Sequence, residues 1–305
     1  MLDRSITRLP GLAACIGLGL AALSLLDPGL LALSVPGLTL AWGGYAFRRQ
    51  RATTLLLAAC LATTYAAVAW SGPDFAADSP SYYVYLRSAL FDRDLDFANE
   101  WAHWGFPERP TTSTGHRLNQ HAAGSACLWS PFVLAGHLYV VVGGGLGLHR
   151  FPADGFSLPY LRAAALGTAT LVVFGLLLLI RTLMPRFGPR LAVVAALGTT
   201  LASPVPYYVL VQPLMAHGNI FALACALVFV WFRAHQQPTL RRWALLGALL
   251  GLLALTRWQA IVYGALLVPL ILSGWRRRAL PWLWLAAGAA AAVLAFLPQM
   301  IAWQT

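Results

Sequence analysis

The chain has 305 residues, of which 59% are hydrophobic and only 10% charged, and its formal net charge is +11. Soluble domains carry about 25% charged residues, so this composition excludes a soluble globular protein. Apolar runs close to the ~20 residues that cross a bilayer recur along the chain, which predicts an all-α, polytopic transmembrane helical bundle. The sequence contains no lysine. That excludes a P-loop and a Schiff-base lysine.

The arginines stand in short clusters between apolar runs rather than along one basic face. This pattern is typical of topology signals and not of a nucleic-acid surface, so nucleic acid is not an expected partner. Arg4 and Arg8 place the N-terminus in the cytoplasm. Residues 73–125 then face the outer side, and seven of the ten acidic residues lie between Asp74 and Glu108. The expected preceding elements are an N-terminal transmembrane hairpin over 1–51, with spans at 9–26 and 30–47, and a third span at 52–70.

The remainder of the chain, within a transmembrane module over 52–305, is expected to cross the membrane repeatedly. The expected spans are 159–180, 191–210, 218–232, two short crossings within 243–273 that turn near Arg257, and a last span from Trp282. The run 126–144 contains Pro131 and a Gly143-Gly144-Gly145 break, so we expect it to be re-entrant or buried in protein. Because no polar tail follows Trp303, we also expect the chain to be truncated at its C-terminus.

The outer loop 73–125 should carry short helices and any chemistry. Ser79 followed by Pro80 predicts a helix start, with the serine as cap, and the helix should run to about Leu90. Asp78 would then stand at the helix N-terminus, where an ionised carboxylate is favoured. Two interpretations of Asp78 remain open, a capping residue or a catalytic carboxylate, and they are compatible.

The same segment contains candidate metal ligands. Asp92, Asp94 and Asp96 resemble the start of a calcium loop, but an EF-hand is excluded because Phe97 and His103 occupy the positions of its glycine and glutamate. Another divalent metal site stays possible, with a solvated turn as the favoured alternative. His103, His116, His121, Glu100 and Glu108 match no standard zinc spacing, which favours ordinary polar loop residues.

Two residues near the outer ends of spans are candidates for substrate binding. Arg257 lies at an expected outer turn, where its guanidinium could neutralise a phosphate or simply reach to the membrane surface. His217 should face the same side, with a structural hydrogen-bonded histidine as the alternative. Trp101, Trp104 and Trp129 fit an interfacial aromatic belt or a sugar-stacking platform.

Several features together resemble a known family: an outer loop that opens with Asp78, a tyrosine-bearing helix after it, and the polar run Asn119-Gln120-His121 ahead of Leu128-Trp129-Ser130-Pro131-Phe132. Over about residues 52–305 the chain resembles the GT-C membrane glycosyltransferases. More narrowly, it is similar to bacterial relatives of the protein O-mannosyltransferases and of the lipid A aminoarabinose transferases.

The resemblance implies transfer of a sugar, with inversion, from a polyprenyl-phosphate donor to a hydroxyl of a lipid, glycan or protein acceptor. It implies an active site on the periplasmic face of a bacterial inner membrane, in contact with membrane lipids. Asp78 matches the family's catalytic aspartate, although Ser79 stands where the family often has glutamate. A second carboxylate would then come from Asp92, Asp94 or Glu100.

For substrate binding we expect Arg257, His217, Tyr83, Arg87, Gln120 and His121. Tyr83 and Arg87 share a helical face, so Arg87 could assist Arg257 at the phosphate. No cofactor is required, although a divalent metal is possible. Two rivals remain: a transporter or flippase for a lipid-linked or anionic substrate, which would show paired polar residues at midplane and internal repeats, and a noncatalytic scaffold or fragment.

Overall fold

The computed structural model describes residues 75, 78–106, 110–276 and 281–304. Within these residues it is built of helices, and the only β-pairing is a bridge between Thr111 and Arg117. The spans expected at 9–26, 30–47 and 52–70 lie outside the described residues. In chain order the elements are α5 (Ser79–Arg87), η2 (Ser88–Asp92), α6 (Ala98–His103), α7 (Gly124–Gly145), α8 (Leu158–Leu201), α9 (Tyr207–Leu210), α10 (Ala216–Gln236), α11 (Leu240–Thr256), η3 (Trp258–Leu266), α12 (Leu267–Arg276) and α13 (Trp282–Ala302).

Helical stretches of the described part confirm the expected polytopic all-α bundle. Five of them are long and apolar enough to cross a membrane: Gly124–Gly145, Leu158–Leu201, Ala216–Gln236, Trp258–Trp275 and Trp282–Ala302. Many of their large apolar side chains point away from the protein, as those of Leu138, Val194 and Val262 do. Such exposure suits contact with lipid, where an apolar surface needs no cover.

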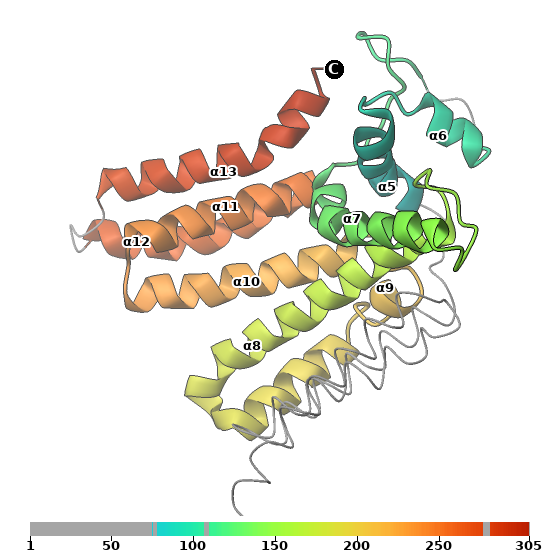
Figure 1. Cartoon of the computed structure of the whole chain (residues 1–305). Helices are drawn as coiled ribbons and strands as arrows, with labels where there is room; N and C mark the ends of the chain where they lie inside the picture. Colours follow the sequence, from blue (N-terminus) through green and yellow to red (C-terminus); the bar gives the residue numbers. More distant parts are fainter. Residues whose placement is uncertain (1–74, 76–77, 107–109, 277–280, 305) are drawn as a thin grey trace, which may run out of the picture.

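Helices α10, α11 and α13 lie side by side (Figure 1). The contact between α11 and α13 depends on small residues, because a Cβ atom added to Gly247 would collide with the carbonyl oxygen of Gly288. One turn further along, a Cβ atom on Gly251 would collide with the carbonyl oxygen of Ala292. Glycines that let two backbones touch are the common means by which helices associate in a membrane.

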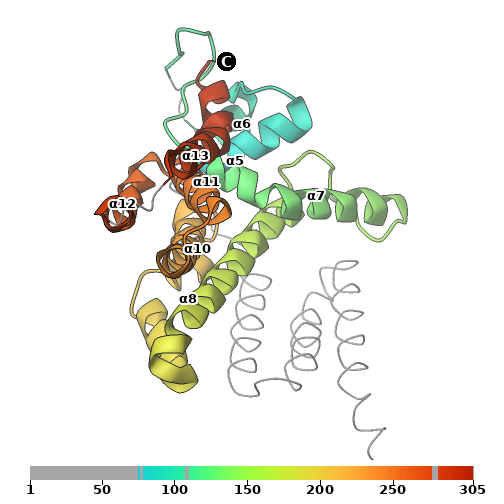
Figure 2. The same ribbon diagram turned by 90° about the vertical axis from the view of Figure 1, so that its left-hand side faces the viewer.

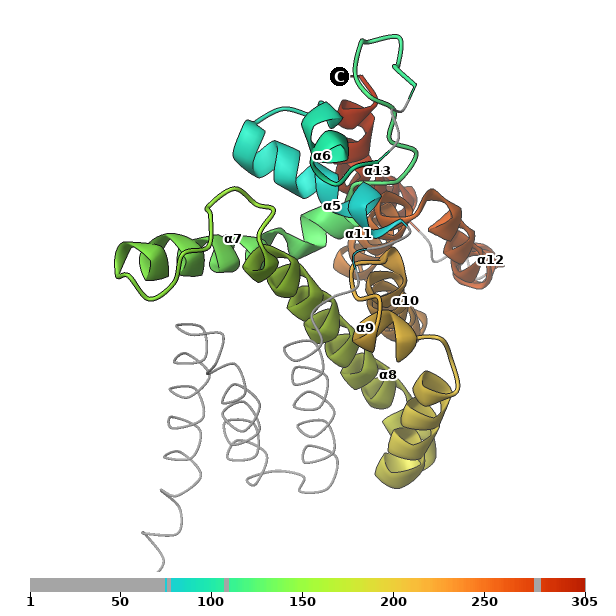
Figure 3. The ribbon, with the colours of Figure 1, turned by 90° about the vertical axis from the view of Figure 1, so that its right-hand side faces the viewer.

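Helix α7 runs across this group rather than alongside it. Figure 2 views α10, α11 and α13 nearly end-on while α7 lies lengthwise, and Figure 3 shows α7 extending away from the bundle. The expected break and the expected burial in protein are both wrong, because α7 is one continuous helix of 22 residues with many exposed side chains.

Pro131 does not break α7 because a neighbouring side chain replaces the missing hydrogen bond. A proline lacks the N–H that would bond to the carbonyl four residues earlier, which here belongs to Cys127. The hydroxyl of Ser130 donates to this same carbonyl at 2.8 Å. The glycine run Gly143–Gly145 forms the last three residues of the helix and does not interrupt it.

Helix α8 covers the expected span 159–180 and the expected turn near 185. The backbone turns at Gly188, whose φ of +74° suits glycine, between Pro185 and Pro189. The expected span 191–210 is wrong in its second half, since the helix ends at Leu201. The prolines Pro204 and Pro206 follow that end, and the short α9 comes after them.

Other expected boundaries agree with the structure. Helix α11 ends at Thr256, so the turn expected near Arg257 is confirmed, and α13 begins at Trp282 as expected. The predicted helix after Pro80 exists, but Ser79 is not its cap: α5 begins at Ser79, with Asp78 in the N-cap position and no side-chain capping hydrogen bond. It continues through the π-helical turn η2 to Asp92.

We predict that Gly247→Ala lowers the free energy of unfolding by about 1–3 kcal/mol, the usual cost of forcing extra volume into a packed contact. The methyl group would push α11 away from the Gly288 backbone. Gly198→Ala is the matched control, because it adds the same methyl to a helix at a site with open space. Equal unfolding curves for the two variants in detergent would contradict a glycine-mediated contact.

Candidate active site

The first residues of α7 bring three helix ends together. A Cβ atom on Gly124 would lie 2.5 Å from the backbone of Leu255 and Thr256, so the start of α7 touches the end of α11. The backbone N–H of Ala123 donates to Oε1 of Gln299 in α13 at 2.8 Å. Asn219 in α10 donates through Nδ2 to the Ser125 hydroxyl at 3.1 Å. The loop before α7 therefore lies over the ends of α10, α11 and α13.

Asn119 fastens this loop to α5. Its Nδ2 donates to the carbonyl of Ser81 at 2.8 Å, and its Oδ1 accepts from the backbone N–H of His121 at 3.1 Å. The Tyr85 hydroxyl donates to the His121 carbonyl at 2.8 Å. His121 is thus held at two backbone atoms, and its ring meets that of Tyr82 edge-on with 4.9 Å between centroids.

A pocket of about 310 Å³ lies where this loop meets the turn after α11. We call it the outer pocket; it is lined by Tyr82, Gln120, His121, Ala122, Arg257, Trp258 and Gln259. Asp78 stands beside it, because its Oδ2 lies 3.4 Å from Nε2 of His121. The Asp78 side chain is 49% exposed, which leaves the carboxylate open to an incoming molecule.

Arg257 is held by a histidine rather than by an acid. Its Nη1 donates to Nε2 of His217 at 2.8 Å, and the His217 ring stacks on Tyr208 with 3.9 Å between centroids. No carboxylate of a described residue forms an ion pair with Arg257. A guanidinium without a carboxylate partner among the described residues, at the edge of a pocket, suits a phosphate.

Charges on both sides of the outer pocket act on one side chain, that of Tyr82. Burial raises the pKa of the Tyr82 hydroxyl to about 12, with Arg257 acting to lower it and Asp78 to raise it. Asp78 and Arg257 therefore belong to one electrostatic cluster, and Tyr82 keeps its proton at neutral pH as a hydrogen-bond donor.

Five of the sequence-predicted site residues meet here or at the pocket edge, namely Asp78, Gln120, His121, His217 and Arg257. Tyr83 and Arg87 do not. Tyr83 is fully buried and donates to the Gly155 carbonyl at 2.8 Å. We therefore read these two residues as structural rather than substrate-binding.

Arg87 forms the centre of a buried network on the other face of α5. It pairs with Glu100 at 3.1 Å and with Asp92, and its Nε donates to the Asp154 carbonyl at 3.2 Å. Its guanidinium also lies 4.1 Å from the ring centroid of Phe156. With these partners, Arg87 fastens α6 and the loop before α8 to α5 and is not available to assist a phosphate.

The carboxylates considered as metal ligands have protein partners instead. Asp92 accepts from Arg87 and from Asn99, while Asp94 accepts from the hydroxyl of Ser88 at 2.7 Å. Among the described residues no three His, Cys, Asp or Glu side chains come close enough to hold an ion. Glu100 is buried against Arg87, so neither it nor Asp92 is placed to act as the second carboxylate.

The positions of Trp101, Trp104 and Trp129 fit neither an interfacial aromatic belt nor a sugar-stacking platform. Trp101 and Trp129 are buried, and the Trp129 indole donates to the Thr168 hydroxyl at 2.8 Å. Trp104 packs against Phe75. Trp101 and Trp129 are core residues and Trp104 is half-buried against the core, whereas Trp258 is 60% exposed and lines the outer pocket.

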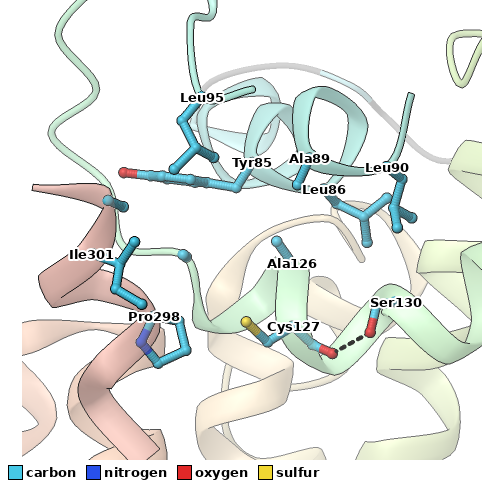
Figure 4. Close-up of a pocket in the computed structure, with 12 residues that line it drawn as sticks. Tyr85, Leu86, Ala89, Leu90, Leu95, Ala126, Cys127, Ser130, Pro298 and Ile301 are labelled. Atoms are coloured by element: carbon cyan, nitrogen blue, oxygen red, sulfur yellow. Dashed lines mark hydrogen bonds between the residues drawn. The ribbon is translucent and has the colours of Figure 1, made fainter. Parts of the chain in front are cut away.

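Two apolar pockets flank the site. One, of about 430 Å³, lies between α5, the start of α7 and the end of α13, with Tyr85, Cys127 and Ile301 among its lining residues (Figure 4). The other, of about 380 Å³, runs along α10 and includes Tyr208, His217 and Tyr263. The second lies beside the site, because it is lined by His217, which holds Arg257.

Sequence reasoning missed Tyr82, Trp258, Gln259 and Tyr208. A helical period could have identified Tyr82, since it lies four residues after Asp78 and so on the same face. By the same rule Tyr83 and Arg87 belong to a different face. Trp258 and Gln259 directly follow Arg257, so the turn that presents the arginine also presents them.

We predict that Glu100→Gln changes how stability depends on pH. Burial raises the pKa of Glu100 from 4.5 to about 7, so the folded protein binds the proton more tightly than the unfolded chain between these values. The parent should therefore lose stability as the pH rises from about 4.5 to 7, by at most about 3 kcal/mol, while the glutamine variant lacks this loss. Thermal unfolding at several pH values measures it.

Asn99→Ala is the control for this experiment, because it removes a neighbour of the network, a donor to Asp92, without changing a titratable group. Its stability should differ from that of the parent by a constant amount across the pH range. A Glu100→Gln protein with the same pH dependence as the parent would contradict the assignment.

Comparison with known proteins provides independent information. Residues 160–303 match the model of the dolichyl-phosphate-mannose-protein mannosyltransferase family. No curated protein and no solved structure gives a significant match. The family match covers α8 to α13, which carry Arg257 and His217, and stops short of α5 and Asp78. It confirms the resemblance to the GT-C membrane glycosyltransferases, and with the apolar helices it supports a membrane glycosyltransferase.

Proposed function

We propose that the chain transfers a sugar, with inversion, from a polyprenyl-phosphate donor to the hydroxyl of a lipid, glycan or protein acceptor at the outer pocket. One observation carries this proposal. An open carboxylate, Asp78, and a guanidinium without an acidic partner among the described residues, Arg257, belong to the same cluster. A transfer from a lipid phosphate needs these two groups, a base for the acceptor and a cation for the leaving phosphate.

The reaction follows from these two roles. The acceptor oxygen attacks the anomeric carbon and forms the new C–O bond, while its proton passes to the Asp78 carboxylate. The bond between the anomeric carbon and the phosphate oxygen breaks, and its electron pair leaves with the phosphate. Arg257 neutralises the charge that develops there, with His217 holding the guanidinium in place. The Tyr82 hydroxyl and the Trp258 ring are available to the sugar.

The donor's lipid chain has an apolar path to this site. The pocket along α10 is lined by apolar side chains such as Phe221 and Val228 and ends at His217. A polyprenyl chain lying in it would bring its phosphate to Arg257 without leaving the membrane region. This entry from the bilayer explains why no nucleotide-binding loop is required.

Arginine positions support an outer, periplasmic location for the site in a bacterial inner membrane. His217 and Arg257 lie at one end of α10 and α11, whereas Arg233, Arg241 and Arg242 lie at the other. Cytoplasmic ends of spans are enriched in arginine, so the end with the outer pocket faces outward. Five of the six described acidic residues lie between Asp78 and Glu100, in the segment that carries α5 and α6.

We predict that Asp78→Asn folds normally and loses transfer. The Asp78 side chain makes no capping hydrogen bond, so an amide of the same shape should leave α5 intact. Loss of a positioned general base typically lowers the rate by about 10²–10⁴-fold. The assay would follow release of polyprenyl phosphate from a polyprenyl-phosphate mannose donor, mannose being the sugar in the name of the matched family.

Asp96→Asn is the matched control, since it makes the same change in the outer segment at a carboxylate that accepts only from the nearby Ala98 N–H. It should keep the parental rate. Near-parental transfer by a folded Asp78→Asn protein would remove Asp78 as the base, and an unfolded variant would point to a structural role.

We predict that Arg257→Ala weakens donor binding more than Arg257→Lys. Lysine keeps the positive charge but loses the planar fork that bonds two phosphate oxygens, and alanine loses both. A charge-assisted hydrogen bond contributes roughly 1.5–3 kcal/mol, so alanine should weaken binding by at least about tenfold. Titration of the purified protein with the donor lipid gives the affinities.

Arg150→Ala serves as the control because it removes an exposed arginine in the loop after α7, away from the outer pocket. It should bind donor as the parent does. If Arg257→Ala also binds like the parent, then Arg257 is a surface-reaching arginine and holds no phosphate.

A further inference from the structure

A second polar pocket lies at the far end of the bundle from the outer pocket. We call it the arginine pocket; it has a volume of about 300 Å³, and Arg181, Arg186, Arg233 and Arg242 are among the residues that line it. They come from three elements: the end of the first part of α8, the last turn of α10 and the first turn of α11. Arginines that only mark topology have no need to converge on one cavity.

Among the described residues, no acidic side chain balances these charges. The sequence contains no Asp or Glu after Asp154, so the three helices that form the pocket carry none. Within the described part of the chain, none of the four arginines takes part in an ion pair. Like charges that share a pocket repel one another unless an anion lies between them.

The guanidinium groups are held by the protein without being neutralised. Arg186 lies over the ring of Phe232 at 4.0 Å, and Arg233 over that of Phe229 at 4.8 Å. Arg242 donates to the carbonyls of Arg233 and Gln237 at the end of α10. Arg181 and Arg186 have no hydrogen bond to a described residue, so their donors remain available in the pocket.

The position of the pocket relative to the membrane follows from α10. This helix has 21 residues, begins next to His217 and ends beyond Arg233. At 1.5 Å per residue it spans about 30 Å, which equals the hydrocarbon thickness of a bilayer. The arginine pocket is therefore level with the headgroups of the leaflet opposite the outer pocket, and the lower end of α8 and the adjoining end of α10 in Figure 1 mark its place.

We propose that the arginine pocket binds the phosphate of an anionic phospholipid headgroup in this opposite leaflet. Free phosphate has the same chemistry, but the rings of Phe229 and Phe232 and the exposed apolar faces of the surrounding helices favour a phosphate that carries acyl chains. Basic pockets between transmembrane helices at this depth suit such headgroups. The site is separate from sugar transfer, and its binding can be measured without any activity.

The test uses the full chain, purified and delipidated in detergent, with Arg181→Gln/Arg186→Gln as the test variant. Native mass spectrometry would count bound phosphatidylglycerol, phosphatidylcholine or inorganic phosphate, and thermal unfolding would be followed with each. The control, Arg190→Gln/Arg241→Gln, removes two charges from the same end of the bundle at exposed arginines outside the pocket. Both variants keep Arg242, which caps α10.

We expect the parent to bind phosphatidylglycerol and to be stabilised by it, with little effect of phosphatidylcholine or inorganic phosphate. The test variant should bind at least about tenfold more weakly, because it loses charge-assisted hydrogen bonds, while the control should bind nearly as the parent does. Equal losses of phosphatidylglycerol binding in both variants would attribute the binding to general surface charge and overturn the proposal. Equally strong competition by inorganic phosphate would assign the pocket to a soluble anion instead of a lipid.

Discussion

The close approach of Gly124 to the last turn of α11 is the constraint on which the candidate site depends. Any side chain there would meet the backbone of Leu255 and Thr256, so only glycine lets the loop before α7 lie directly beside Arg257. His121 precedes the glycine by three residues and Arg257 follows Thr256, which places the two sides of the outer pocket within reach of one substrate. The hydrogen bonds from Ala123 and to Ser125 fix the same point to α13 and α10.

Polar residues on the two faces of α5 have different roles. Asp78 and Tyr82 face the pocket, whereas Tyr83 and Arg87 face Gly155 and Glu100. A buried ion pair costs desolvation and contributes little net stability, but removal of one partner is severe. The Arg87 network is therefore better understood as a device that specifies how α6 and the loop before α8 lie on α5, and through α5 as the support of Asp78.

The fold was more predictable from the sequence than the site. Apolar runs indicate contact with lipid, and arginine clusters indicate topology. Both act on each stretch of the chain separately, so the turn at Arg257 and the start of α13 at Trp282 were predicted correctly. The course of α7 was not, because a single hydroxyl, that of Ser130, offsets the effect of Pro131. Asp78, His121, His217 and Arg257 were predicted as site residues one by one. Their pairing depends on contacts between distant segments, which no local pattern encodes.

The hydrogen bond between Ala123 and Gln299 determines when, during synthesis of the chain, the candidate site can form. The oxygen that accepts the Ala123 N–H belongs to Gln299, which is separated from it by 176 residues and lies in α13. Proteins are synthesised from the N-terminus, so the loop that carries His121 cannot make this contact until the chain has been made as far as Gln299 in α13. Completion of the candidate site then depends on α13, and chains that stop before α13 lack this contact.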